Sequence, residues 1–281
     1  MTLVNKLLVA VTAAAIVTVL IIAAAWFPGT NLSSESAMLA AAEIALEPHR
    51  VEAPPKPLYD YVVVSDSCGP DFDGECVNIR KGPGENFPVV AQLRAGAVLQ
   101  AEEKVQADGR EWYKLTYNEW LRYPERAGRN LYIAAQFVEP FRDEGIKEVG
   151  EGEQASSTKM ILVDRSSQKL YAYDGEELFM EETVSTGLEL TPTPRGTFSV
   201  YKKTPTRYMQ GPIPGISDQY YDLPGVPWNL YFTNEGAVIH GAYWHDKFGK
   251  PWSHGCVNLP PEKARILYSW AELGTRVIVR D

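Results

Sequence analysis

The feature that most constrains the fold is a succession of short apolar, β-branched segments, interrupted every few residues by glycine, proline or Asp-Gly turns, which runs from residue 58 to the C-terminus. A strand needs only four to eight such residues, whereas an amphipathic helix needs an apolar repeat of about 3.6 residues over a longer stretch. One segment has that repeat: it opens at Pro260-Pro261, presents Ala264, Leu267, Tyr268 and Ala271 on one face, and meets Gly274. The pattern predicts a mainly β chain with one helix near its end.

Changes in composition divide the chain further. The expected parts, in chain order, are a membrane anchor or signal peptide (1–27), a Pro/Ala-rich linker (28–57), a small β domain (58–140), an acidic linker (141–158) and a second β domain (159–281). Within the second β domain, residues 204–227 are rich in proline, glycine and tyrosine. An irregular stretch of that length predicts a lid or binding loop.

The N-terminal part contains an uncharged apolar run from Leu7 to Phe27. A helix of that length can cross a hydrocarbon core of about 30 Å. Lys6 precedes the run, which predicts a cytoplasmic N-terminus and an extracytoplasmic remainder. The alternative is a cleaved signal peptide, because Ala23-Ala24-Ala25 offers small residues for cleavage. Both alternatives place the rest of the chain in the cell envelope, either single-pass anchored to the membrane through residues 7–27 or secreted.

The acidic composition argues against nucleic acid as a partner. The formal net charge is -9 and the sequence pI is about 5.1. A nucleic-acid interface neutralises phosphates with a basic stripe or an arginine-rich block, and this sequence has neither.

The chain has three cysteines, and their positions suggest different roles. Cys68 and Cys76 flank a glycine- and proline-containing segment, which predicts a disulfide that closes a short loop in an oxidising compartment. Cys256 is left without a partner. An unpaired thiol outside the membrane is exposed to oxidation, so we expect it to have a chemical role; the alternative is a buried, inert cysteine.

The neighbours of Cys256 favour the chemical role. His240, His245 and His254 all precede it closely, and the predicted helix follows it. An imidazole or a helix N-terminus near a thiol favours the thiolate. Gly255 has no side chain, so a carbonyl oxygen can approach its N–H as in an oxyanion hole. The residues alone leave the base open between His240, at the end of a predicted strand, and His254.

Two resemblances to known families follow from these motifs. His240-Gly241 followed, after an interval, by Ser253-His254-Gly255-Cys256-Val257-Asn258 resembles the signature of the YkuD-type L,D-transpeptidases. The resemblance implies a β-sandwich-like catalytic domain in which His240 is the base and Cys256 the nucleophile. It further implies that Gly241 orients His240 through its main chain. The resemblance also implies residues at or beside the substrate, and some aromatic residues are candidates for lining the groove. Together these are Ser253, His254, Asn258, Arg195, Trp252 and Tyr221.

The second resemblance lies in the small β domain. The run 77–84, followed by Val89-Val90, 93–96 and 112–115, is similar to the core of bacterial SH3-like domains, which implies a small β-barrel. In those families such a module docks enzymes on cell-wall polymers; the alternative is that it only spaces or braces the catalytic domain. The stretch from Asn118 to Asn130 departs from the compact pattern.

The resemblances imply a peptidoglycan L,D-transpeptidase that needs no cofactor or metal. Cys256 would attack the bond before the terminal D-Ala of a stem tetrapeptide, form a thioester, and pass the acyl group to an amine; water as acceptor would give an L,D-carboxypeptidase side activity. The alternatives are a sortase-like transpeptidase that uses Arg265, a zinc site built on the histidines and Cys256, and a non-catalytic wall-binding anchor. An NlpC/P60-type peptidase is disfavoured because its cysteine precedes its histidine.

Overall fold

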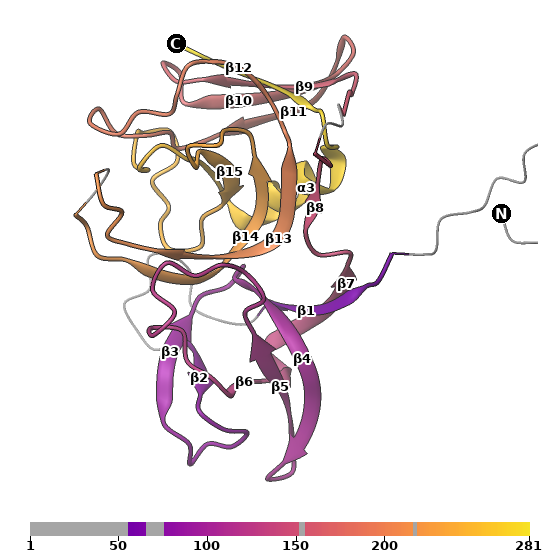
Figure 1. Cartoon of the computed structure of the whole chain (residues 1–281), viewed down its shortest axis with the longest axis vertical. Coiled ribbons are helices and arrows are strands. Elements are labelled where there is room, and N and C mark those ends of the chain that lie inside the picture. Colours follow the sequence, from indigo (N-terminus) through magenta and orange to yellow (C-terminus); the bar gives the residue numbers. More distant parts are fainter. Residues whose placement is uncertain (1–55, 66–75, 152–154, 216–217) are drawn as a thin grey trace, which may run out of the picture. The chain divides into compact units, whose positions relative to one another are not determined.

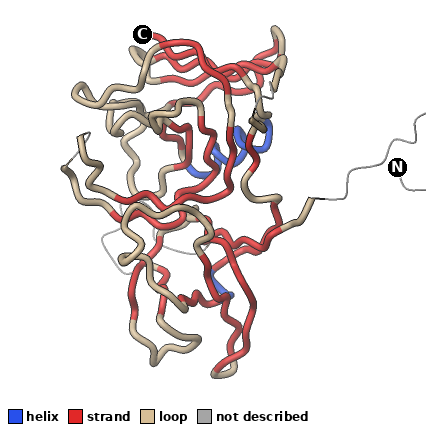
Figure 2. Tube along the Cα trace, in the orientation of Figure 1, coloured by secondary structure: helices blue, strands red, loops and turns tan. Residues whose placement is uncertain are grey.

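The computed structural model describes residues 56–65, 76–151, 155–215 and 218–281. The predicted membrane segment, the Pro/Ala-rich linker and Cys68 lie outside these ranges, so the predicted anchor and the Cys68–Cys76 bond stay predictions. Within the described ranges, no helix combines the length and apolar character needed to cross a membrane. Figure 2 shows that strands dominate this part of the chain, as predicted.

The N-terminal β domain is one antiparallel sheet. Its strands are β1 (Tyr59–Val64), β2 (Val77–Arg80), β3 (Val89–Leu93), β4 (Val98–Ala107), β5 (Arg110–Thr116), β6 (Leu131–Ala134) and β7 (Val138–Asp143), with a short 3-10 helix η1 (Ala135–Phe137). Asp108 and Gly109 join β4 to β5 with φ of 51° and 73°, the left-handed pair that a tight hairpin turn requires. Ile79, Leu99 and Ile133 are fully buried in its core.

The predicted barrel is not closed. The strand order is β3-β2-β6-β5-β4-β1-β7, so β3 and β7 are the two ends of an open seven-stranded sheet. β7 is engaged elsewhere: Phe141 on β7 packs its ring 5.3 Å from that of Trp228 in the second β domain. Among the described residues, β7 pairs with β1, and no pairing joins β7 to β3.

The second β domain contains two five-stranded sheets and one helix (Figure 1). The first sheet has the order β11-β10-β9-β17-β12, formed by β9 (Lys159–Asp164), β10 (Lys169–Asp174), β11 (Glu177–Thr183), β12 (Gly196–Ser199) and β17 (Arg276–Arg280). The second has the order β16-β15-β14-β13-β8, formed by β8 (Lys147–Glu148), β13 (Lys202–Gln210), β14 (Asp222–Tyr231), β15 (Val238–Gly241) and β16 (Val257–Leu259).

The predicted helix is α3 (Pro261–Trp270), with Pro261 in its first turn. Ala264, Leu267 and Tyr268 are its buried residues, as the apolar repeat predicted. Tyr268 packs 5.4 Å from Trp228 on β14, and Trp270 stacks 4.9 Å from Phe179 on β11. The helix therefore contacts both sheets and holds β16, which immediately precedes it, in place.

The prediction of an irregular lid over residues 204–227 is wrong for most of that segment. Residues 202–210 and 222–231 pair as an antiparallel hairpin with a bulge between Arg207 and Met209. Prolines and glycines interrupt the alternation of apolar and polar residues, which hides the strands from the sequence pattern. Of the described residues between Lys202 and Tyr231, only 211–215 and 218–221 lie outside the two strands, and we refer to them as the hairpin tip.

A long loop of the N-terminal domain reaches this hairpin. Residues 117–130, between β5 and β6, form what we call the β5–β6 insert; it contains the stretch that departs from the SH3-like pattern. Tyr123 donates its hydroxyl to Pro212 O at 2.9 Å, and Arg126 donates to Gly211 O at 2.6 Å. The main chain of Tyr208 donates to Glu119 Oε1 at 2.8 Å. The insert is thus attached to both the second sheet and the hairpin tip.

Candidate active site

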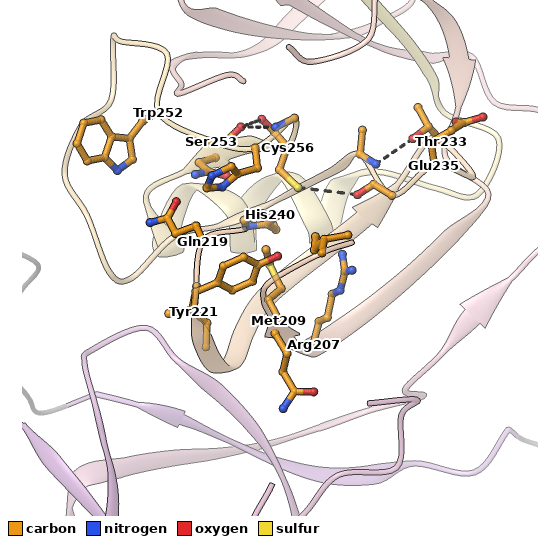
Figure 3. A pocket seen from close by; sticks show the side chains of 18 of the residues that line it. Arg207, Met209, Gln219, Tyr221, Thr233, Glu235, His240, Trp252, Ser253 and Cys256 are labelled. Atoms are coloured by element: carbon orange, nitrogen blue, oxygen red, sulfur yellow. Dashed lines mark hydrogen bonds between the residues drawn. The ribbon is translucent and has the colours of Figure 1, made fainter. Parts of the chain in front are cut away.

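A pocket of about 690 Å³ lies over the second sheet and holds the candidate nucleophile (Figure 3). Its lining comes from β13, β15, the loop before β16 and the β5–β6 insert. The lining includes Trp120, Arg122, Arg207, Tyr221, His240, Trp252, Ser253, His254, Gly255, Cys256 and Asn258.

Strand pairing brings the cysteine and the histidine together. β15 and β16 are parallel, with Ile239 opposite Val257 and His240 opposite Asn258. Cys256 immediately precedes β16, and its side chain and that of His240 line the same pocket (Figure 3). Residues far apart in sequence therefore converge on one pocket.

His240 has the properties of a general base. Its side chain is completely buried, its Nδ1 lies 3.0 Å from Gly241 O, and its Nε2 is buried without a hydrogen-bond partner. Burial lowers the pKa of His240 to about 4, and the positive charge of Arg207 contributes in the same direction. The neutral ring keeps its proton on Nδ1, facing the carbonyl, which leaves the Nε2 lone pair to accept a proton.

Gly241 acts on His240 through its main chain alone. A Cβ at this position would lie 2.8 Å from Pro227 Cγ, so the structure has no room for a side chain there. The carbonyl of Gly241 occupies the place that a hydroxyl or carboxylate takes in other catalytic triads.

Cys256 is half-buried, and its Sγ lies 3.9 Å from Gly236 O. Burial raises the pKa of the thiol above its ordinary value, while the charge of Arg207 and the Val238 N–H partly oppose that increase. The raised pKa disfavours the thiolate that the following helix is predicted to stabilise, and that thiolate stays a prediction. A thiol beside a neutral imidazole would pass its proton to the imidazole as it attacks.

Two side-chain hydroxyl groups form hydrogen bonds with the backbone around Cys256. Ser253 Oγ accepts from Gly255 N–H at 3.1 Å and donates to Cys256 O at 2.6 Å, as Figure 3 shows. Thr193 Oγ1 donates to the same carbonyl at 3.3 Å. Gly255 has a φ of 114°, which a residue with a Cβ rarely adopts. In the free protein the Gly255 N–H is thus already bonded, and an oxyanion would have to displace Ser253 Oγ to use it.

The other predicted site residues fall into two groups. His254, half-buried, stacks on Tyr221 with ring centroids 6.2 Å apart, and both line the pocket with the exposed Trp252. Asn258 lines it too, but its amide nitrogen lies 2.9 Å from His245 Nε2. Their contact with substrate stays a prediction.

Arg195 is the predicted residue that the structure does not bring to the pocket. It is absent from the lining and pairs with Asp281, the last residue of the chain. The sequence could not show this, because the pairing depends on β12 lying beside β17.

Several pocket residues were not predicted, among them Arg207, Trp120 and Arg122. Arg207 lies on β13 beneath the thiol, and Trp120 and Arg122 come from the β5–β6 insert, with the Arg122 guanidinium 5.5 Å from the Trp120 ring. The sequence pattern gives little indication of these residues. Arg207 lies in a stretch predicted to be a loop, and the insert departs from the SH3-like pattern without a motif of its own.

The geometry defines a cysteine–histidine site of the acyl-transfer type, without a third side chain. Among the described residues, no group of three or more His, Cys, Asp or Glu side chains converges as a metal ion would require, so the zinc alternative lacks geometric support.

Comparison with known proteins agrees with this class. Residues 158–279 match the L,D-transpeptidase catalytic domain (YkuD), and residues 76–138 match the bacterial SH3 domain. The chain thus carries a catalytic domain of the YkuD L,D-transpeptidase family preceded by a bacterial SH3 domain.

Individual relatives are distant. L,D-transpeptidase 1 of Mycobacterium tuberculosis is 26% identical over 141 residues, which cover 48% of this chain and 55% of the relative. The chain therefore matches only about half the length of that curated relative. Among solved structures, the catalytic domain of the E. faecium L,D-transpeptidase is 28% identical, with 46% of this chain and 100% of that chain covered and a TM-score of 0.39. An L,D-transpeptidase from Mycobacterium smegmatis is 20% identical, with 64% and 99% covered and a TM-score of 0.42.

Proposed function

We propose that this chain is a peptidoglycan L,D-transpeptidase in which Cys256 is acylated and His240 is the base. One observation carries the proposal: Cys256 and a neutral His240, whose Nε2 has no hydrogen-bond partner among the described residues, line one pocket beside the parallel pair of β15 and β16. The family match of residues 158–279 supplies the reaction class.

The first half-reaction is acyl transfer to the enzyme. His240 Nε2 takes the thiol proton as Sγ attacks the carbonyl carbon before the terminal D-Ala of a stem tetrapeptide. The bond between that carbon and the D-Ala nitrogen breaks, and the proton on His240 passes to the departing amine. The product is a thioester on Cys256 and free D-alanine.

The second half-reaction transfers the acyl group. An amine on another stem attacks the thioester carbon, His240 accepts the proton lost by the amine and returns it to sulfur, and a new amide cross-link remains. Water in place of the amine gives the hydrolysed tripeptide, which is the carboxypeptidase side reaction. Half-buried Tyr221 and exposed Trp252 are suited to contact the peptide at the pocket wall.

The test is incubation with purified disaccharide-tetrapeptides, followed by mass spectrometry of the products and of the intact protein. We expect cross-linked dimers, free D-alanine, and a covalent mass increase when a carbapenem is added. Cys256→Ser should show none of these, whereas Trp252→Ala should still acquire the carbapenem. Wild-type protein that produces neither dimers nor a covalent adduct would contradict the enzyme and support the non-catalytic anchor.

The sortase-like alternative requires an arginine beside the thiol, and its candidate was Arg265. That residue lies on α3 with its guanidinium 5.6 Å from the Trp228 ring, and it does not line the pocket. A sortase-like product from a sorting-motif peptide, without activity on tetrapeptides, would overturn the preference.

We further propose that the protein works in the cell envelope, exported through residues 1–27, and that its SH3-like domain binds cell-wall polymer. Fractionation of cells that express the full chain should place it outside the cytoplasm. Co-sedimentation of the purified protein with isolated sacculi should retain it in the pellet, and a mostly soluble protein in both assays would refute these two proposals.

A further inference from the structure

Arg207 is a cation in the pocket that has no acidic partner. No carboxylate among the described residues lies within ion-pairing distance of its guanidinium, and its Nη1 is buried without a hydrogen-bond partner. The guanidinium lies 5.5 Å from the Tyr231 ring, which supports it from one side. A buried charge without a counter-ion raises the free energy of the folded protein. We therefore expect the Arg207 guanidinium to pair with an anion that a bound ligand provides.

The position of Arg207 limits which anion that can be. Figure 3 shows the side chain rising from β13 with its guanidinium directed toward the part of the pocket that holds Cys256. Its charge acts on both catalytic groups, since it lowers the pKa of Cys256 and that of His240. An anion bound to this guanidinium would lie in the part of the pocket that holds Cys256, close to the bond that breaks.

The acidic side chain whose charge acts on Arg207 does not serve as its ion-pair partner. Glu119 of the β5–β6 insert interacts with Arg207 only through space, and its carboxylate accepts the Tyr208 N–H. Burial raises the pKa of Glu119 to about 7, so near neutral pH it is partly protonated and offsets the Arg207 charge incompletely.

We propose that Arg207 binds the free C-terminal carboxylate of the acyl donor, the carboxylate of the residue that leaves. This inference rests on the proposed function. In a peptide cut before its last residue, that carboxylate is one residue beyond the attacked carbonyl, a span of about 4 Å. A planar guanidinium matches a carboxylate with two parallel hydrogen bonds. The interaction would make the enzyme select donors that end one residue after the scissile bond.

The experiment compares two donors, a stem tetrapeptide with a free C-terminal carboxylate and the same peptide with a C-terminal amide. Release of D-alanine or D-alaninamide gives kcat/KM for each, and the ratio of the two values measures recognition of the carboxylate. A loss of thiol reactivity affects both donors equally and cancels in the ratio. We expect wild type to prefer the free acid, and Arg207→Gln to reduce that preference about tenfold to a hundredfold, the usual effect of a charged hydrogen bond. Arg207→Lys should restore part of it.

Two matched arginines serve as controls. Arg122→Gln removes the other pocket cation, and Arg265→Gln removes one outside the pocket; both should keep the preference. Equal use of the two donors by wild type, an equal loss on both donors in Arg207→Gln, or loss of the preference in Arg122→Gln instead would overturn the inference while leaving the transpeptidase proposal intact. Wild type that releases nothing from either donor and forms no carbapenem adduct would refute both.

Discussion

Two hydrogen bonds join the main chain of Tyr123 to the side-chain amide of Gln210: Tyr123 N donates to Gln210 Oε1 at 2.9 Å, and Gln210 Nε2 donates to Tyr123 O at 3.0 Å. One residue belongs to the β5–β6 insert and the other ends β13, so this pair joins the SH3-like domain to the hairpin that forms the pocket. These contacts agree with the alternative in which the N-terminal domain braces the catalytic domain, and binding of cell-wall polymer stays a proposal.

The Tyr123–Gln210 contact yields a stability prediction. Gln210→Ala leaves both Tyr123 main-chain groups without their partner, and we expect it to lower the free energy of unfolding by about 2 kcal/mol. It should also reduce transpeptidation, because the hairpin loses one of its attachments to the β5–β6 insert. Urea denaturation and dimer formation measure the two effects. The control is Gln106→Ala, which removes an exposed hydrogen bond to Glu111 between β4 and β5. It should change neither the free energy of unfolding nor dimer formation.

His240 gives a prediction on the pH dependence of the reaction. Burial lowers its pKa to about 4, so the base stays neutral down to that pH. The acid limb of kcat/KM should therefore fall near pH 4 and not near the 6.5 of an ordinary histidine. His245→Asn should retain the limb. An acid limb well above pH 4 would contradict the assignment of His240 as the base.

The same residue affects stability in a defined direction. An unfolded chain protonates His240 at a pKa of 6.5, whereas the folded chain resists protonation until about 4. The stability contributed by burying the neutral ring is therefore fully present above pH 6.5 and is lost as the pH falls toward 4, by up to about 3 kcal/mol. Chemical denaturation of His240→Gln across this range should show a shallower dependence on pH than wild type. His245, with a pKa also lowered to about 4 by burial, contributes in the same direction and is unchanged in this variant.

Reactivity of the thiol is the fourth prediction. Because burial raises the pKa of Cys256, alkylation by iodoacetamide should be slow at neutral pH and increase above the range of an ordinary thiol. Arg207→Gln removes a charge that opposes this increase and should slow alkylation further, whereas Arg265→Gln should not. Mass spectrometry of the labelled protein follows the reaction. Rapid alkylation of wild type at pH 7 would show that the thiolate is already formed.

Gly255 gives a prediction about backbone conformation. A Cβ at Gly255 meets nothing closer than 3.8 Å, so space is available, but the φ of 114° is strained for alanine. We expect Gly255→Ala to cost about 1–3 kcal/mol and to reduce acylation by turning Cys256 away from His240. Gly175→Ala, at a turn with a φ of 61° and open space, should cost less and leave acylation unchanged.

Local pattern was sufficient for some of the fold. The Asp108-Gly109 and Asp174-Gly175 turns and helix α3 depend on residues close in sequence, and they stand where the pattern predicted them. The barrel and the lid were wrong, since closure of a sheet and pairing of a proline-containing hairpin are decided by contacts between distant segments.

The sequence by itself determined the chemical types at the site: one unpaired cysteine after a glycine, a histidine followed by a residue without a side chain, and a helix after them. Only the tertiary structure decided how they are used. The parallel pairing of β15 and β16 brings His240 and Cys256 to one pocket, and burial favours the neutral form of both groups. The pairing of β12 with β17 brings Arg195 beside Asp281 at the C-terminus. Strand β13 of the hairpin brings Arg207 into the pocket that holds Cys256. The reason is physical: the pKa of a group and the partners of a charge depend on what surrounds it in space, which the order of residues along the chain does not state.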